Sequence, residues 1–387
     1  MKLRYILLIV LFIFILAPSI QAQTWSDRKQ LTYTGGCSIN PAVAADTIEG
    51  VHIVWERESA TWPDIYYKGS LGWGESWLTP DRLSWTNGQS SYPAIAVDST
   101  GRKHVFWHDS SPPGIENNEI FYKHSAHLAS WSTLVRATWT SEGSAHPAAA
   151  VDSNDNVHLV WIDCTPGNWE IFYKYTSDRG NTWSVATRLT WDSEASFYPA
   201  IDIDSSDNIH IIWQNHKANT FRIHYKRSTD GGSSFSAVTR LTLPSWDCWY
   251  PDVATDSNGW VHVVYANHQT PNNEVYYKKS TDGGETWSAP TRITYNAGYS
   301  TRPEIAVDTS DNLHLVWEDD TYGNAEILYK ESTDGGSTWS AIYRLTWDSN
   351  FSGFPVIAAD QMDYVHVVWR NNTVHDAAWE LFYKNRK

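Results

Sequence analysis

A proline and a histidine recur along the whole sequence at a nearly constant interval. Successive histidines are separated by 52 or 54 residues, and the prolines keep the same intervals. The residues are Pro41, Pro93, Pro147, Pro199, Pro251, Pro303 and Pro355, with His52, His104, His158, His210, His262, His314 and His366. A fixed period of about 50 residues is typical of repeat architectures, in which each unit completes its core against its neighbours. Seven units therefore follow one another without a linker.

Each unit is predicted to form four short strands. In the third unit, apolar runs at 147–151, 157–161, 170–174 and 182–191 are separated by segments rich in Gly, Asn, Asp and Ser, which are turn formers. Aromatic residues make up 14% of the chain, and aromatic enrichment favours strands over helices. We therefore expect an all-β chain of four-stranded antiparallel units.

A single four-stranded unit of about 50 residues cannot bury both of its faces, so the units are predicted to pack around an axis as a seven-bladed β-propeller. The seventh unit stops after its third strand at 380–384, whereas 24–33 resembles a fourth strand. We expect this N-terminal strand to complete the last blade, which closes the ring as one domain over 23–387. A linear solenoid is the alternative, but it would leave open sheet edges and the sequence has no capping repeats.

The first 22 residues have the order of a secretory signal. Lys2 and Arg4 precede an apolar run over 5–17, and Ala22 ends the segment, as in cleaved export signals. We expect a signal peptide over 1–22, export to the medium or the cell envelope, and no membrane span in the mature chain. Retention as an N-terminal anchor is the alternative, although about 13 apolar residues are few for a bilayer.

The charge balance and the cysteines exclude several classes of partner and cofactor. The formal net charge is −15, which disfavours a nucleic-acid backbone as the partner. Cys37, Cys164 and Cys248 show no ligand spacing, so we expect no metal and no cofactor, and at most one disulfide. We also expect a monomer.

The turn between the third and fourth strands approximates S-x-D-x-G-x-T-W and recurs at 176–183, 228–235, 280–287 and 332–339. Its Asp and hydroxyl groups are suited to bond the amides of the turn, its Gly allows positive φ, and its Trp is expected to pack across the hairpin. The residues in these structural roles are Asp178, Gly180, Trp183, Asp230, Gly232, Asp282, Gly284, Trp287, Asp334, Gly336 and Trp339.

These turns resemble the Asp-box, or bacterial neuraminidase repeat, of sialidase-like propellers. The resemblance implies the propeller fold, whereas the Asp-box is a folding element in that family and carries no activity. An exo-sialidase would need an arginine cluster, an acid-base carboxylate and a Tyr activated by a Glu. However, sialidase propellers have one blade fewer, and their Arg-Ile-Pro signature is reduced here to Arg222-Ile223-His224. We therefore expect a glycan-binding or interaction module without catalytic activity, with a glycoside hydrolase of exo-sialidase type as the alternative.

Five of the units also pair an acid at the start of the third strand with an arginine of the fourth. Glu170 is predicted to lie directly opposite Arg188, as a cross-strand pair worth about 0.2 to 1 kcal/mol. The repeated histidines are spread around the ring, so they are interpreted as structural hydrogen-bonding groups rather than metal ligands. Because a feature present in every blade is architectural, a unique site is expected where blades depart from the repeat.

Such departures gather in the fourth to seventh units, on the face of the variable loops. Arg222 replaces the repeated acid and is predicted to face Arg240, and Arg302 stands before a repeat proline. Other candidates are carboxylates that follow the proline, an arginine after a repeat tryptophan, and aromatic side chains as stacking surfaces for a glycan or a cell-surface partner. The candidate ligand-binding residues are Arg222, Trp246, Trp249, Tyr250, Asp252, Arg302, Glu304 and Arg370. Sequence drift in solvated loops is the alternative interpretation, and no catalytic residue is predicted.

Overall fold

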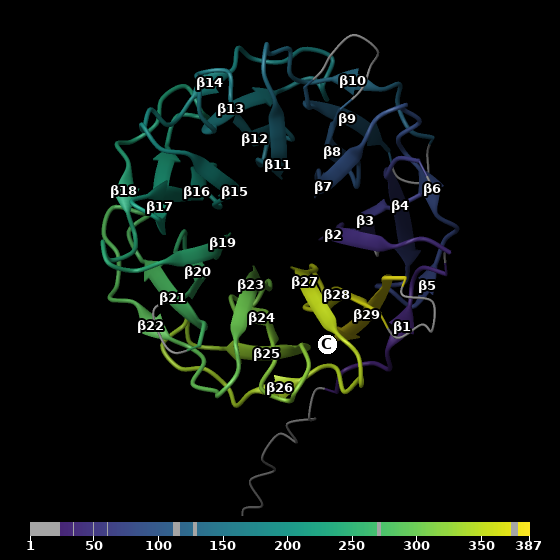
Figure 1. The fold of residues 1–387 in the computed structure, drawn as a ribbon, viewed down its shortest axis with the longest axis vertical. Coiled ribbons are helices and arrows are strands. Elements are labelled where there is room, and N and C mark those ends of the chain that lie inside the picture. The colour runs from purple at the N-terminus through teal and green to yellow at the C-terminus, as the bar shows by residue number, and fades with distance from the viewer. Residues whose placement is uncertain are drawn as a thin grey trace, which may run out of the picture.

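The computed structural model describes residues 24–33, 35–48, 50–59, 61–110, 117–126, 130–268, 272–372 and 378–387. These residues form seven antiparallel sheets arranged in a ring, which confirms the predicted seven-bladed β-propeller (Figure 1). The predicted signal peptide lies outside the described residues. Within the described ranges there is no helix long and apolar enough to cross a membrane.

The four strands of each blade are ordered from the central channel outward to the circumference (Figure 1). The first, innermost strands are β2 (Ser38–Ala45), β7 (Ser90–Val97), β11 (Ser144–Val151), β15 (Ser196–Ile203), β19 (Cys248–Thr255), β23 (Ser300–Val307) and β27 (Ser352–Ala359). The second strands are β3 (Val51–Arg57), β8 (Lys103–Asp109), β12 (Val157–Asp163), β16 (Ile209–Lys217), β20 (Val261–Asn267), β24 (Leu313–Asp319) and β28 (Val365–Asn371).

The two outer strands of each blade differ in length. The third strands are β4 (Asp64–Leu71), β9 (Glu119–Ser125), β13 (Glu170–Thr176), β17 (Thr220–Ser228), β21 (Glu274–Ser280), β25 (Glu326–Ser332) and β29 (Glu380–Arg386). The fourth strands are β6 (Asp81–Arg82), β10 (Val135–Arg136), β14 (Thr187–Arg188), β18 (Thr239–Arg240), β22 (Thr291–Arg292), β26 (Tyr343–Arg344) and β1 (Lys29–Gln30), and β5 (Ser76–Trp77) adds a short pairing to the first blade.

The ring closes through the N-terminal strand, as predicted. Strand β1 pairs with β29, with Lys29 opposite Tyr383, and the Leu31 amide donates to the Leu381 carbonyl at 2.8 Å. The sheet of the last blade is therefore built from both ends of the chain, and the closure leaves no open blade edge at the junction.

The hydrophobic core lies between adjacent blades. One cluster joins Val54, Ile65 and Leu83 of the first blade to Val105 and Trp107 of the second. The second strands are buried on both faces because each blade has a neighbour on either side, which explains their nearly continuous apolar sequence.

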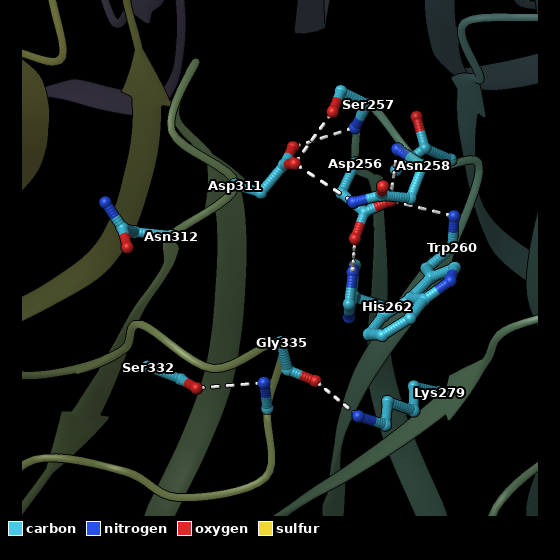
Figure 2. Close-up of polar contacts among 12 residues, drawn as sticks. Asp256, Ser257, Asn258, Trp260, His262, Lys279, Asp311, Asn312, Ser332 and Gly335 are labelled. Atoms are coloured by element: carbon cyan, nitrogen blue, oxygen red, sulfur yellow. Dashed lines mark hydrogen bonds and ion pairs between the residues drawn. The ribbon is translucent and has the colours of Figure 1, made fainter.

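The repeated histidines are structural hydrogen-bonding groups, as predicted. His262 bonds the Tyr277 hydroxyl through Nδ1 at 2.7 Å. Its Nε2 bonds the Asp256 carboxylate at 3.3 Å (Figure 2). The Asp256 carboxylate also accepts from the Trp260 amide at 2.9 Å, so it fixes the turn between the first two strands. The same Asp-His-Tyr chain recurs in every blade.

The S-x-D-x-G-x-T-W turns join each blade to the preceding one. In the sixth blade, the Gly336 amide donates to Ser332 Oγ at 2.8 Å and the Thr338 amide donates to Asp334 Oδ1 at 2.8 Å. Trp339 packs edge-on against Tyr277 of the fifth blade, with ring centroids 5.3 Å apart. The expectation that this tryptophan packs across its own hairpin was therefore wrong, because the neighbouring blade offers the larger apolar surface.

The acid-arginine pairs form, but not in the predicted register. Arg188 lies opposite Phe172, two residues beyond Glu170, and its long side chain reaches back so that Nη2 is 2.9 Å from Glu170 Oε1. The Glu170 side chain is fully buried, where it also accepts from the Thr190 hydroxyl. These pairs are therefore partly buried networks rather than surface ion pairs. No disulfide joins any two of the three cysteines.

Candidate functional site

A cavity of about 250 Å³ lies at one mouth of the central channel. It is lined by the residues around the repeat prolines, so every blade contributes to its wall. The lining residues are Asn40, Pro41, Tyr92, Pro93, His146, Pro147, Tyr198, Pro199, Ala200, Tyr250, Pro251, Asp252, Arg302, Glu304, Phe354, Pro355 and Val356.

The residue before each repeat proline is held in a left-handed backbone conformation. In β23 the pairing with β24 is interrupted between Thr301 and Glu304, and Arg302 in this bulge has a φ of 51°. A bulge re-aims side chains, and here it places seven side chains around the channel mouth. The residues are Asn40, Tyr92, His146, Tyr198, Tyr250, Arg302 and Phe354, with φ between 48° and 54°. Such a conformation costs about 1 to 2 kcal/mol in a non-glycine residue, and strain of this kind is concentrated at functional sites.

Two arginines form the cationic side of the mouth. The guanidinium of Arg302 lies 3.6 Å from the Phe354 ring centroid, and that of Arg370 lies 3.5 Å from the same centroid. Two groups this close to one ring occupy opposite faces of it, so Phe354 separates the charges. Burial, with a smaller contribution from Arg302, lowers the pKa of Arg370 to about 10. Its buried Nε has no hydrogen-bond partner.

The counter-charge at these arginines is incomplete. Glu318 Oε2 lies 3.9 Å from Arg302 Nε and accepts a hydrogen bond from the Phe354 amide at 3.2 Å. Burial raises the pKa of Glu318, although both arginines oppose this shift. Arg302 also donates to the Tyr250 hydroxyl at 3.2 Å. Among the described residues, Glu318 is therefore the one carboxylate at ion-pair distance from these two guanidinium groups, although the charge of Arg302 also acts on the buried Glu304.

The other side of the mouth is formed by tyrosines and neutral histidines. The ring centroids of Tyr92 and His146 are 4.2 Å apart, and those of His146 and Tyr198 are 4.9 Å apart. Burial lowers the pKa of His146 to about 4, and burial with a smaller effect from His146 lowers that of His108 to about 3. Both imidazoles are therefore neutral at pH 7, and this wall presents uncharged hydrogen-bonding groups to the cavity.

Carboxyl groups line the channel wall beyond the proline ring. Burial raises the pKa of Asp252 to about 7, and burial together with the charge of Asp252 raises that of Glu304 well above its usual range. Asp252 accepts from the Ile305 amide at 2.8 Å. Asp202 lies further along its first strand, where burial raises its pKa although the Thr255 hydroxyl donates to it at 2.8 Å. At neutral pH this layer therefore retains protons.

The structure gathers only part of the predicted site. Tyr250, Asp252, Arg302 and Glu304 line the cavity, and Arg370 stacks beside it. The remaining candidates lie outside this lining.

Trp249 packs against Phe221, with centroids 4.2 Å apart, and Trp246 packs against Tyr276 at 5.0 Å. Arg222 lies opposite Asn215 within the extended hairpin of β16 and β17, whereas Arg240 lies opposite His224, so the predicted register of Arg222 and Arg240 was wrong. The tight turn at Ala218 and Asn219, both with positive φ, lengthens this hairpin.

Sequence reasoning missed most of the aromatic wall. Tyr92, His146, Tyr198 and Phe354 stand at the same repeat position as Arg302 and Tyr250, but only those two were predicted, Arg302 because of its charge and Tyr250 as an aromatic stacking surface. The available signal was the position itself, since every side chain before a repeat proline faces the channel mouth. Among the described residues, no cluster of His, Cys, Asp and Glu could hold a metal ion.

No protein-family model matches the chain, and no curated protein matches it. Similar solved structures include an ulvan lyase, a polysaccharide lyase bound to -[GlcA(1-4)Rha3S]-, with 12% identity, a TM-score of 0.65, and coverage of 91% of this chain and 95% of that chain. A protein of unknown function from Dyadobacter fermentans has 12% identity and a TM-score of 0.59 over 95% of this chain and 100% of that chain. The intramolecular trans-sialidase from Ruminococcus gnavus has 13% identity and a TM-score of 0.51 over 90% of this chain and 94% of that chain. At these identities the likeness shows the fold alone, a propeller shared with sialidases and a polysaccharide lyase.

Proposed function

We propose that this protein is a glycan-binding propeller whose channel mouth holds an acidic sugar. The observation that carries the proposal is the arrangement of Arg302 and Arg370 on opposite faces of Phe354, where Glu318 is the one carboxylate at ion-pair distance among the described residues. A guanidinium binds a carboxylate or a sulfate through parallel hydrogen bonds. The buried Arg370 Nε, which has no partner, is a donor that such a group would satisfy.

Two further observations support a sugar as the ligand. The mouth combines the cationic pair with tyrosines and neutral histidines, which suits a ligand with an anionic group, hydroxyl groups and apolar ring faces. A solved propeller of similar fold, the ulvan lyase, is bound to a chain that contains GlcA, a uronic acid. The S-x-D-x-G-x-T-W turns, which resemble the Asp-box, add the fold-level analogy to sialidases. With an export signal over 1–22, such a module would meet its glycans outside the cytoplasm.

The test is calorimetric titration of the mature chain with glucuronate-containing oligosaccharides and with their neutral analogues. Arg302→Gln and Arg370→Gln are each expected to weaken binding of the acidic sugar about 10-fold or more, because a charge-assisted pair is lost. Arg227→Gln is the matched control, since Arg227 bonds the Gly283 carbonyl of the next blade. Equal affinity for acidic and neutral sugars, or no loss in either mouth variant, would contradict the proposal.

A second candidate function is a glycoside hydrolase of exo-sialidase type. It is favoured by Asp252 and Glu304, whose raised pKa values leave a protonated carboxyl group at the wall of the same cavity. A carboxyl group kept protonated near neutral pH is suited to act as a general acid. Turnover of a fluorogenic sialoside by the wild type, lost in Glu304→Gln, would establish hydrolysis. Binding of the sugar without turnover would support the glycan-binding function instead.

A further inference from the structure

A second surface of the molecule carries exposed aromatic side chains at one repeat position. The position follows the fourth strand of each blade, directly after a buried Thr or Ser. Six of the seven blades have Trp or Tyr there: Tyr33, Trp85, Trp139, Trp191, Tyr295 and Trp347, which are 77%, 72%, 76%, 66%, 73% and 60% exposed. The remaining residue at this position is Leu243. Indole and phenol rings are costly to leave in water, so six such residues at one repeat position call for an explanation.

These side chains lie on the same face as the channel mouth. The chain passes from the end of a fourth strand, at the circumference (Figure 1), to the beginning of the next first strand beside the channel. The bulges that line the cavity occur near the beginning of those first strands. The exposed rings therefore form an outer circle, here called the aromatic rim, around the face in which the cavity opens.

The rings are held in place by the arginines of the buried pairs. The Arg82 guanidinium lies 4.2 Å from the Trp85 centroid, and that of Arg136 lies 4.0 Å from the Trp139 centroid. Each arginine is itself fixed by a carboxylate, since Arg136 Nη2 is 2.6 Å from Glu119 Oε1. Five of the six rings have such an arginine beside them, and Tyr33 is the exception among the described contacts. Because all six side chains are at least 60% exposed, much of each ring remains open to solvent.

We propose that the aromatic rim is a set of stacking platforms for the sugar rings of a long acidic polysaccharide. This inference rests on the proposed function of the channel mouth and extends it from a single acidic sugar to a chain. Flat aromatic faces suit the apolar faces of pyranose rings, and the guanidinium beside five of the six platforms complements an anionic chain. A polymer offers the same unit repeatedly, as the blades do, and several weak contacts on one chain raise its affinity through effective concentration.

The first experiment compares long chains with short fragments of the same polymers. Polygalacturonate and ulvan are titrated against the mature protein, each beside its own disaccharide fragment. For the wild type we expect at least one long chain to bind about 10-fold or more tightly than its fragment, expressed per acidic unit. Trp139→Ala with Trp191→Ala, in adjacent blades, is expected to reduce this chain-length ratio severalfold. Affinity for the fragment and the melting temperature should stay the same, because these side chains are 76% and 66% exposed.

The fourth blade provides the opposite experiment. Leu243→Trp adds a platform where the repeat lacks one, beside Arg240 of the same blade, and is expected to raise the chain-length ratio about 2-fold or more. Val185→Trp is the matched control, because Val185 is 90% exposed and precedes β14 rather than following it. An equal increase in this control would show nonspecific adhesion to tryptophan and would overturn the inference.

The outcomes separate the rim from the mouth. If the fragment binds through Arg302 and Arg370 but the ratio is unchanged in the rim variants, the rim inference is wrong and the proposed function stands. If rim variants lower the affinity for long chains while Arg302→Gln has no effect, the proposed function is wrong and the rim remains as an independent site. A wild type that binds neither long chain overturns the inference.

Discussion

Among the described residues, the hydroxyls of five repeated tyrosines lie against a turn of the next blade, and a glycine of that turn provides the space. Gly232 has a φ of 86°, and a Cβ on it would overlap the hydroxyl of Tyr173. Gly231 beside it has a φ of 67° and open space where a Cβ would lie. At the residue scale, the contact between blades therefore depends on one glycine of the pair, while the other serves only the backbone conformation.

Substitution of the two glycines should separate these effects. Gly231→Ala is expected to cost about 1 kcal/mol of unfolding free energy, because only the left-handed conformation is penalised. Gly232→Ala is expected to cost about 2 to 4 kcal/mol, because the methyl group also displaces Tyr173 from the interface between blades. Urea unfolding of both variants measures the difference, and equal midpoints would contradict the assigned contact.

The buried carboxyl groups of the channel give a pH-dependent prediction. The folded-state pKa of Asp252 is about 7, above the ordinary value of 3.8. The folded state therefore binds this proton more tightly than the unfolded state, and stability is lost as the pH rises from about 4 to about 7. Asp252→Asn and Glu304→Gln are expected to raise the melting temperature at about pH 8 and to have little effect at about pH 4. A stabilisation that is the same at both pH values would show that the carboxyl groups are not protonated in the native protein.

At the scale of strands and hairpins, the fourth blade differs most from the repeat. Its β16 and β17 continue to the tight turn at Ala218 and Asn219, and Arg222 stands where the other blades have a buried Glu or Asp. The Arg222 Nε is buried without a hydrogen-bond partner. This hairpin therefore has a buried hydrogen-bond donor without an acceptor, and its arginine lies outside the lining of the channel mouth.

Arg222→Glu should restore the pair that the other blades have. A carboxylate at this position can accept from Thr242 and from Arg240, so we expect the unfolding free energy to rise by about 1 kcal/mol. Binding of acidic sugars at the channel mouth should not change. The converse variant, Arg188→Ala, is expected to cost about 1 to 3 kcal/mol, because it leaves the buried Glu170 without its cation. Thermal unfolding and calorimetric titration of both variants test these expectations. Weaker sugar binding by Arg222→Glu would show that Arg222 does contribute to the ligand-binding site.

Closure of the last blade depends on a strand of two residues and its flanks. Trp25 packs edge-on against Tyr329 with centroids 5.0 Å apart, and the Leu381 amide donates to Thr32 Oγ1 at 2.9 Å. Deleting residues 24–33 is therefore expected to lower the melting temperature by 10 °C or more, on the order of several kcal/mol, and to promote aggregation through the exposed edge of β29. A chain that begins at residue 24 is the control. A deletion variant that stays monomeric, with an unchanged melting temperature, would contradict closure by this strand.

At the scale of the whole molecule, stability depends on contacts between blades, and many of these involve buried, neutral histidines. Burial lowers the pKa values of His146 and His224 to about 4, below the ordinary value of 6.5. The unfolded state binds these protons more readily than the folded state. The stability that the neutral imidazoles provide is therefore complete above about pH 6.5 and is lost as the pH falls towards 4.

Acidification should therefore destabilise the ring as a unit. In the double variant Asp252→Asn with Glu304→Gln, where this pair of channel carboxyl groups no longer offsets the effect, the melting temperature is expected to fall steadily from about pH 6.5 to about pH 4. Adding His224→Gln should flatten part of that decline, because His224 is one of the groups that must take up a proton. A flat profile in the double variant would contradict neutral burial of these histidines.

The sequence determined the architecture because repetition acts locally in every unit. The histidine that recurs seven times from His52 to His366 predicted the number of blades, and the fourth-strand pattern at 24–33 predicted the closure of the ring. Arg302, Asp252 and Glu304 were also found from the sequence, since an unrepeated charge stands out against a repeated background. Those predictions needed only the order of residues along the chain.

Tertiary structure alone decided which departures from the repeat meet. Arg222 and Trp246 are as unusual in sequence as Arg302, but Arg222 lies in the outer hairpin of its blade and Trp246 packs against Tyr276, so neither lines the channel mouth. Tyr92 is unremarkable in sequence, yet its bulge places it across the mouth from two arginines. The repeat fixes what each blade is, whereas the convergence of the blades on one axis brings residues from distant units into one cavity. Proximity across that axis is a property of the closed ring, and the sequence of one unit does not contain it.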